Sequence, residues 1–279
     1  MRIAGRSIGY TEPVYIVAEI GANHNHNLPM TLRLVRGLAL AGADAVKIQT
    51  YLPDDFGRNR EVYEQAHLPL EYHAPLFEEA ARCGVTMFST PGREWAVDWL
   101  EANVDPPAYK ISSTSCTNLS LVRKCRDTGK PVIVSTGGCG TADVNAVVAA
   151  FGDDLDRLAL LKCTASYPAP TGELNLSAIA SLKLLYKNKV VVGFSDHTPW
   201  EVGPEAAIAA VQYGASIVER HVRMEGYPAL DEDVSLTVEQ FGYYVLAVRR
   251  AQAMKGHGIP GPSPSEQAVE WLREELRSD

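Results

Sequence analysis

The sequence has few cysteines, no long apolar run and no excess of positive charge, and each deficit excludes a class of protein. Its five cysteines are scattered and form no Cys-X-X-Cys pair, which argues against a disulfide framework or a zinc cage and fits reduced thiols in a cytoplasm. No run approaches the roughly 20 apolar residues of a membrane span, and residues 1–15 hold no apolar signal core. A net charge of −8 disfavours a nucleic-acid partner. We therefore expect a cytoplasmic protein without nucleic-acid or membrane partners.

What the chain does contain is a regular alternation of short apolar runs and longer stretches with helical spacing. Eight runs read as buried strands, at residues 14–19, 45–49, 85–90, 108–113, 132–136, 158–164, 190–197 and 216–221. Strand–helix alternation is typical of a parallel sheet. Eight such units in roughly 250 residues predict a closed TIM (β/α)8 barrel, an α/β fold whose active sites lie at the carboxyl ends of the strands.

The remaining segments divide the chain into one barrel domain and a tail. Helices are expected at residues 30–41, 71–83, 93–103, 119–128, 142–150, 176–186, 200–213 and 238–254. Residues 1–13 predict a short N-terminal hairpin that plugs the bottom of the barrel. The polar stretch 51–70 contains two prolines and little periodicity, so no element is predicted there. The barrel domain spans 1–255, and 256–279 is expected to form a Gly/Pro-rich linker and a short C-terminal helix.

Two histidines, His197 and His221, stand at the ends of the last two predicted strands. Neighbouring strands lie about 5 Å apart, so two inward imidazoles there are placed to share one divalent cation and leave positions for water and substrate. The alternative is a hydrogen-bonded structural pair. The adjacent carboxylates Asp196 and Glu219 favour the metal site.

Two lysines, Lys47 and Lys110, lie among apolar neighbours within predicted strands. A barrel interior holds an ammonium group only if an anion neutralises it. That anion is either a bound ligand or a protein carboxylate, with Glu19 the obvious partner for Lys47. A third interpretation is a Schiff-base lysine of a metal-independent aldolase. Glu19 itself would stay ionised and activate water, or would serve only to compensate Lys47.

Hydroxyl groups cluster at the same strand ends and favour an anionic ligand. They belong to Thr90, Ser112, Ser113, Ser135, Thr136, Thr164 and Ser195. Hydroxyls and ammonium groups converging on one mouth predict a site for a phosphate and a carboxylate, to which the glycine-rich turn 135–140 adds backbone N–H groups. The nearby His24 and His26 alternate in an extended segment, so we expect them to point opposite ways and to make loop hydrogen bonds.

In this order the motifs resemble the sialic acid synthase family of phosphoenolpyruvate-dependent enzymes. The matching stretches include AEIGANH, GADAVKIQTY, MFSTP, AYKISS, CTASYPAP, GFSDHT and ERHV, and the resemblance runs from about residue 3 to 267. It implies a TIM barrel in which C3 of phosphoenolpyruvate adds to the open-chain aldehyde of an aldose resembling N-acetylmannosamine. Water attacks C2, phosphate leaves with C–O cleavage, and a sialic-acid-like 2-keto acid results.

The resemblance also implies roles for individual residues. His197 and His221 would hold Mn²⁺ or Mg²⁺, which polarises the aldehyde oxygen. Glu19 and Glu219 would orient or deprotonate the attacking water. The phosphoenolpyruvate ligands would be Lys47, Thr90, Lys110, Ser113, Ser135 and Ser195, and the sugar ligands would be Gln49, Tyr167 and Asp231.

Three departures from the family pattern concern mainly the acceptor sugar. The sequence ends where the linker to the family's antifreeze-like domain begins, so we expect that domain and its donated arginine to be missing. Loop 53–70, a separate capping protein or the second subunit of a homodimer would then cover the mouth. Ala165 replaces a frequent asparagine, and the loop after the second strand is short. A different aldehyde acceptor, a Schiff-base aldolase and a non-catalytic phospho-ligand barrel therefore remain as alternatives.

Overall fold

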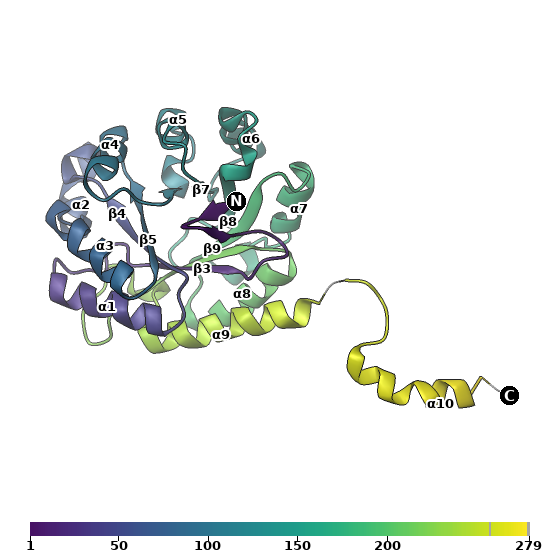
Figure 1. Ribbon diagram of the computed structural model, residues 1–279. Coiled ribbons are helices and arrows are strands. Elements are labelled where there is room, and N and C mark those ends of the chain that lie inside the picture. The colour runs from purple at the N-terminus through teal and green to yellow at the C-terminus, as the bar shows by residue number, and fades with distance from the viewer. Residues whose placement is uncertain (257, 278–279) are drawn as a thin grey trace.

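The computed structural model describes residues 1–256 and 258–277, and its centre is a closed barrel of eight parallel strands (Figure 1). Around the barrel the order is β10-β3-β4-β5-β6-β7-β8-β9. The strands are β3 (Tyr15–Glu19), β4 (Ala45–Thr50), β5 (Thr86–Pro91), β6 (Tyr109–Ile111), β7 (Val132–Ser135), β8 (Leu158–Cys163), β9 (Val191–Asp196) and β10 (Ile217–His221). Each lies within a predicted run or one residue beyond it, and the predicted TIM barrel is confirmed.

Helices form a ring outside the strands, as Figure 1 shows. They are α1 (Leu28–Leu40), α3 (His73–Arg82), α4 (Glu94–Asn103), α5 (Leu119–Asp127), α6 (Thr141–Phe151), α7 (Ala178–Leu185), α8 (Gly203–Gln212) and α9 (Val238–Lys255). All match predicted helices to within three residues. The unpredicted stretch holds a 3-10 helix, Pro53–Asn59, and helix α2, Arg60–Ala66. Helix α2 buries none of its residues, so it has no apolar stripe for a periodicity argument to detect.

The N-terminal hairpin closes the lower end of the barrel, as predicted. Its strands β1 (Arg2–Ile3) and β2 (Arg6–Ser7) pair antiparallel. Ile3 and Ile8 pack against the inward-facing apolar side chains of the strands, among them Phe88 and Ile133. A second apolar layer fills the space between the strands and the helices. The inward positions nearer the carboxyl ends of the strands are polar. The barrel interior is therefore filled by apolar side chains at its lower end and lined by polar side chains at its upper end.

Strand alternation sends Asp196 to the outside of the barrel, which corrects the idea that it supports a metal at His197. Its carboxylate forms a buried ion pair with Arg220 at 2.9 Å and accepts a hydrogen bond from Tyr244 of α9 at 3.0 Å. Arg220 is fully buried and also donates to Thr198. Asp196 therefore fastens β9 and β10 to the helical layer.

Asp196→Ala is expected to lower the free energy of unfolding by about 3–5 kcal/mol, because it leaves the guanidinium of Arg220 buried and uncompensated. Urea denaturation measures the loss. Asp154→Ala, which breaks a half-exposed pair with Arg157, is the matched control and should cost no more than about 1 kcal/mol. Equal losses in the two variants would contradict the assigned role of Asp196.

His73 joins α3 to the barrel as a neutral imidazole. Its Nδ1 faces the carbonyl oxygen of Leu70 at 3.2 Å, and its Nε2 lies 2.8 Å from the hydroxyl of Thr50, which in turn bonds Ser89. This network assigns the proton to Nδ1 and makes Nε2 an acceptor. Burial lowers the pKa of His73 from 6.5 to about 4.

A pKa lowered in the fold makes His73 a source of acid lability. Between pH 6.5 and 4 the unfolded chain binds a proton at this ring and the folded chain does not, so stability falls as pH falls. At pH 5 the loss from His73 amounts to about 2 kcal/mol. Denaturation at pH 7.5 and 5 should therefore show a decline about 2 kcal/mol smaller in His73→Gln than in the unaltered chain. Parallel declines would refute this assignment.

Beyond α9 the chain leaves the barrel. A 3-10 turn, Pro264–Val269, leads into α10, Glu270–Glu275, which Figure 1 shows standing away from the strands. This helix falls within the predicted tail, of which residues 257, 278 and 279 lie outside the described part of the chain. Among the described residues no helix has both the length and the apolar character needed to cross a membrane.

Candidate active site

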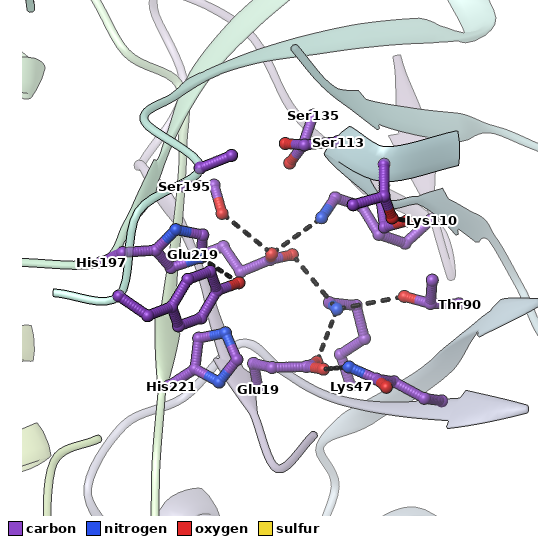
Figure 2. Close-up of a pocket in the computed structure, with 15 residues that line it drawn as sticks. Glu19, Lys47, Thr90, Lys110, Ser113, Ser135, Ser195, His197, Glu219 and His221 are labelled. Atoms are coloured by element: carbon purple, nitrogen blue, oxygen red, sulfur yellow. Dashed lines mark hydrogen bonds and ion pairs between the residues drawn. The ribbon is translucent and has the colours of Figure 1, made fainter. Parts of the chain in front are cut away.

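A cavity opens at the carboxyl ends of the strands and gathers almost all the predicted site residues (Figure 2). It is lined by Glu19, Lys47, Gln49, Thr90, Lys110, Ser113, Ser135, Tyr167, Ser195, His197, Glu219 and His221, together with Ser112, Thr114 and Ala165. Asp231 does not line it but contacts His221 from behind, at 3.4 Å. Thr114 has no strand signal in the sequence because it lies in a 3-10 turn beyond β6.

The floor of the cavity is a network of two lysines and two glutamates, and strand register explains its assembly. Glu19 pairs in register with Lys47, and Glu219 with Ser195, and all four side chains line the cavity. Lys47 Nζ lies 2.6 Å from Glu19 Oε2 and 3.8 Å from Glu219 Oε2. Lys110 Nζ donates to Glu219 Oε1 at 2.8 Å. The salt-bridge interpretation of the lysines is thus correct for the ligand-free protein.

Burial and charge oppose each other in this network. Burial alone would raise the pKa of Glu219, but the ammonium groups of Lys110 and Lys47 outweigh it and hold that pKa low. Burial would lower the pKa of Lys47, but Glu19 and Glu219 raise it. For Lys110 burial prevails, helped by repulsion from Lys47, and its pKa is lowered. Glu219 is therefore a fixed anion at the centre of the floor, as Figure 2 shows.

On the opposite wall from Lys110 and Thr90, His197 and His221 lie with ring centroids 5.3 Å apart (Figure 2). His197 Nδ1 donates to the carbonyl oxygen of Thr164 at 3.0 Å, which leaves Nε2 as an acceptor from the hydroxyl of Tyr167 at 3.0 Å. Burial, reinforced by His221, lowers the pKa of His197 to about 3. The ring is therefore neutral and keeps a lone pair on the cavity side.

This pair fits a divalent cation. Asp231 Oδ2 lies 3.4 Å from His221 Nδ1 without forming a hydrogen bond, and carboxylates orient metal-binding imidazoles through this second ring nitrogen. The 5.3 Å between the ring centroids is compatible with a shared cation, which takes imidazole nitrogens at about 2 Å. Within residues 1–256 and 258–277, no group of three or more His, Cys, Asp or Glu side chains is placed to hold a metal. Water and substrate oxygens would have to complete the shell.

The hydroxyl groups divide between the cavity and the backbone. Ser135 Oγ is buried without a hydrogen-bond partner among the described residues, and a buried hydroxyl is normally hydrogen-bonded, so this group suits a ligand oxygen. Two predicted hydroxyls are wrong: Thr136 donates to the carbonyl of Leu161 at 3.0 Å, and Thr164 to that of Glu173 at 3.2 Å. Thr136 follows the inward-facing Ser135, so alternation turns it away.

The glycine-rich turn contributes through packing. The N–H of Gly137 donates to Ser113 Oγ at 3.0 Å, so it orients that serine and is not free to cradle an anion as predicted. A Cβ on Gly137 would lie 2.8 Å from Ser113 Oγ and 3.0 Å from Cβ of Ala165. Glycine is required here because the turn approaches the neighbouring loop so closely.

Each of the three residues predicted to bind the sugar contacts another side chain of the site. Gln49 Nε2 donates to Glu19 Oε1 at 3.0 Å. The ring of Tyr167 stacks on that of His197 at 4.1 Å, and Asp231 faces His221 as described. Gln49 and Tyr167 therefore line the cavity directly, and Asp231 reaches it only through His221.

His24 and His26 lie in the loop after β3 and do not line the cavity, and one prediction for them is wrong. Their rings stack at 5.3 Å and do not point opposite ways, because Asn25 and His26 have φ of +50° and +47° and the segment is not extended. The predicted loop hydrogen bonds are confirmed, from His24 Nε2 to the carbonyl of Ala66 and from His26 Nε2 to that of His67. They fasten the end of α2 to the loop after β3.

Comparison with known proteins shows the family of the chain. The NeuB family model matches residues 34–260. Pseudaminic acid synthase of Campylobacter jejuni is 36% identical over 265 residues, 88% of this chain and 76% of that protein. N,N'-diacetyllegionaminic acid synthase of Legionella pneumophila is 31% identical, covering 95% and 79%. The crystal structure of sialic acid synthetase from Leptospira borgpetersenii in complex with citrate superposes with a TM-score of 0.90 at 29% identity, covering 100% and 98%.

A barrel with a charged, polar mouth of this composition defines an enzyme of the sialic-acid-synthase-like class. The chain belongs to the NeuB family.

Proposed function

We propose that this enzyme condenses phosphoenolpyruvate with the open-chain aldehyde of an amino sugar, giving a sialic-acid-like 2-keto acid and phosphate. One observation carries the proposal: the lysine pair and the histidine pair open onto the same cavity (Figure 2). The first suits a small polyanion, the second a cation that activates a carbonyl group, and the reaction needs both within bonding distance of each other.

The polyanion would bind against Lys47, Lys110 and the hydroxyls around them. Thr90 accepts from Lys47 at 3.1 Å, and Ser195 donates to Glu219 at 3.1 Å, so these hydroxyls already lie beside the charged groups. Ser135 and Ser113 lie on the side of the cavity away from Lys47 and Glu19 (Figure 2). Charge-assisted hydrogen bonds of this kind are the strong ones for phosphate and carboxylate.

The charge of the floor favours the participation of a metal. Two ammonium groups and two carboxylates sum to no net charge, so a trianion entering the cavity needs further positive charge. His197 and His221 would hold Mn²⁺ or Mg²⁺, which when bound supplies that charge and polarises the aldehyde oxygen as a Lewis acid. Tyr167 would yield its hydrogen bond to His197 and turn toward the sugar, and Asp231 would keep His221 oriented.

Glu19 and Glu219 would orient or deprotonate the attacking water. Glu219 is held anionic by Lys110 and Lys47, and Glu19 is held between Lys47 and Gln49. A fixed carboxylate orients water by accepting a hydrogen bond from it and stabilises the positive charge that develops at C2 of the enol phosphate. Loss of the C–O bond then leaves phosphate among the lysines and hydroxyls.

The acceptor is proposed only as a class. The relatives are named for different acids, pseudaminic and diacetyllegionaminic among them, and the inner site is compatible with either. An aldose resembling N-acetylmannosamine is the first candidate, and a non-sialic aldehyde is the second. Gln49 and Tyr167, which line the cavity, are the side chains placed to distinguish them, and Asp231 would act through His221.

A Schiff-base aldolase is the second candidate, and the lowered pKa of Lys110 favours it. Borohydride reduction with substrate present separates the two chemistries. The proposed condensation predicts no covalent adduct by mass spectrometry and full activity after treatment, whereas a reduced adduct on Lys110 would establish the aldolase.

Phosphate release from phosphoenolpyruvate tests the proposal itself. The assay uses a panel of aldoses, with N-acetylmannosamine first, in the presence of Mn²⁺ and of a chelator. Release that requires both an aldose and the metal is the expected result. Failure to release phosphate with every aldose, or equal release with water alone, would contradict it and would favour a barrel that only binds phospho-ligands.

A further inference from the structure

A second cavity lies outside the barrel, between α6, α7 and the loop that follows β7. It has a volume of about 520 Å³, within the roughly 300–1,000 Å³ typical of small-molecule sites. Its walls are mainly apolar, with Val144, Leu182 and Leu185 among them, and polar groups at Asn175 and Ser181 face the same space. The proposed reaction uses none of these residues.

The floor of this outer cavity is a lysine without a carboxylate. Strand alternation turns Lys162 outward, while its neighbour Leu161 packs inside the barrel. Lys162 Nζ donates to the carbonyl oxygen of Cys163 at 2.7 Å and to Thr164 Oγ1 at 3.3 Å. In the described part of the chain no carboxylate forms an ion pair with it, and none of the described lining residues is acidic.

An uncompensated ammonium under an apolar roof is unusual in a chain of net charge −8. Burial lowers the pKa of Lys162, and an ammonium group withdrawn from water gains from an anionic partner. Both polar partners of Lys162 are neutral oxygens of its own strand end, so its positive charge is directed at the cavity. The complement of such a space is a molecule with one anionic group and an apolar body.

We propose that the outer cavity binds a small amphipathic organic anion, a phosphate or carboxylate whose charged group pairs with Lys162 and whose apolar part packs against Leu182 and Leu185. The site is separate from the barrel mouth but adjoins it. Thr164, which accepts from Lys162, offers its carbonyl oxygen to His197 at 3.0 Å. Lys162 is therefore connected through Thr164 to His197, which lines the barrel mouth.

Phenyl phosphate is the probe, titrated by calorimetry into the full chain with saturating phosphoenolpyruvate and Mn²⁺ to occupy the barrel mouth. One further binding site is expected. Inorganic phosphate, which lacks the apolar part, and benzyl alcohol, which lacks the charge, should each bind at least about tenfold more weakly. Hydrocinnamate in place of phenyl phosphate shows whether the charged group preferred is carboxylate or phosphate.

Variants locate the site. Lys162→Met should weaken phenyl phosphate binding at least about tenfold, and Lys162→Arg, which keeps the charge, should retain it. Lys189→Met, at an exposed lysine outside the cavity, is the matched control and should bind as the unaltered chain does. Absence of binding beyond the barrel mouth, or equal affinity in Lys162→Met and the control, would overturn the proposal. Because this binding needs no turnover, the result does not depend on the proposed reaction.

Discussion

His221→Ala is expected to lower kcat by about 10²–10³-fold and to raise the concentration of Mn²⁺ needed for half-maximal activity. The imidazole is one of only two proposed protein ligands to the cation, and Lewis-acid stabilisation by a metal is worth several kcal/mol. Its Nδ1 contacts Asp231, and its ring forms an edge contact with Tyr167, so its removal takes few structural contacts with it. Steady-state rates over a Mn²⁺ series measure both effects.

The matched control is His67→Ala, at a half-buried histidine that does not line the cavity and whose ring makes an edge contact with His26. It should keep both kcat and the metal requirement of the unaltered chain, and the thermal midpoint of both variants should stay close to it. Full activity of His221→Ala at the usual Mn²⁺ concentration would remove the proposed metal role from this residue.

Lys110→Ala is expected to raise the KM for phosphoenolpyruvate by about 10²-fold while changing that for the aldose little. A hydrogen bond to a charged group contributes roughly 1.5–3 kcal/mol, and Lys110 faces the anion side of the cavity, across from the histidines (Figure 2). Loss of this ammonium also leaves Glu219 with the more distant Lys47 at 3.8 Å, which adds repulsion toward the incoming anion.

Binding measurements on further variants distinguish loss of an anion ligand from loss of folded protein. Lys110→Arg keeps the charge and should recover part of the affinity for phosphoenolpyruvate, and Lys189→Ala should leave it unchanged. If Lys110→Ala weakened aldose and phosphoenolpyruvate equally, Lys110 would be a structural member of the floor and not an anion ligand.

Most of the fold follows from the sequence because each strand and each helix buries apolar side chains with its own period. The runs that end at Glu19 and His221 show this directly, since in both a series of buried apolar residues ends in an ionisable side chain that lines the cavity. Helix α2 was beyond such reasoning, because it packs no residue into the core and is held instead by ring contacts such as that between Phe56 and Tyr63.

Within the site, the position of a residue along its strand predicted well which end of the barrel it occupies. The alternation of inward and outward positions along each strand would have improved the prediction. Lys47, Lys110 and Glu219 share inward positions, and all three meet in the cavity. Asp196 and Thr136 occupy outward positions, and counting from Ser195 and Ser135 would have shown it. No pattern in the sequence reveals that Asp231 stands behind His221, because loop residues 222–237 carry no period.

The prediction that His24 and His26 point opposite ways is wrong for a different reason. The expectation assumed an extended segment, but two residues with positive φ bend the loop and bring the rings together. Asparagine adopts that conformation more readily than most residues, and the asparagines flanking these histidines are the signal that was available.

Crystals grown with Mn²⁺ and phosphoenolpyruvate test the central claim most directly, by anomalous difference density at the manganese absorption edge. The account predicts one peak within bonding distance of Nε2 of both His197 and His221, with the phosphate of phosphoenolpyruvate against Lys47 and Lys110 in the same cavity. Manganese bound elsewhere, or phosphoenolpyruvate held away from the two lysines, would contradict it.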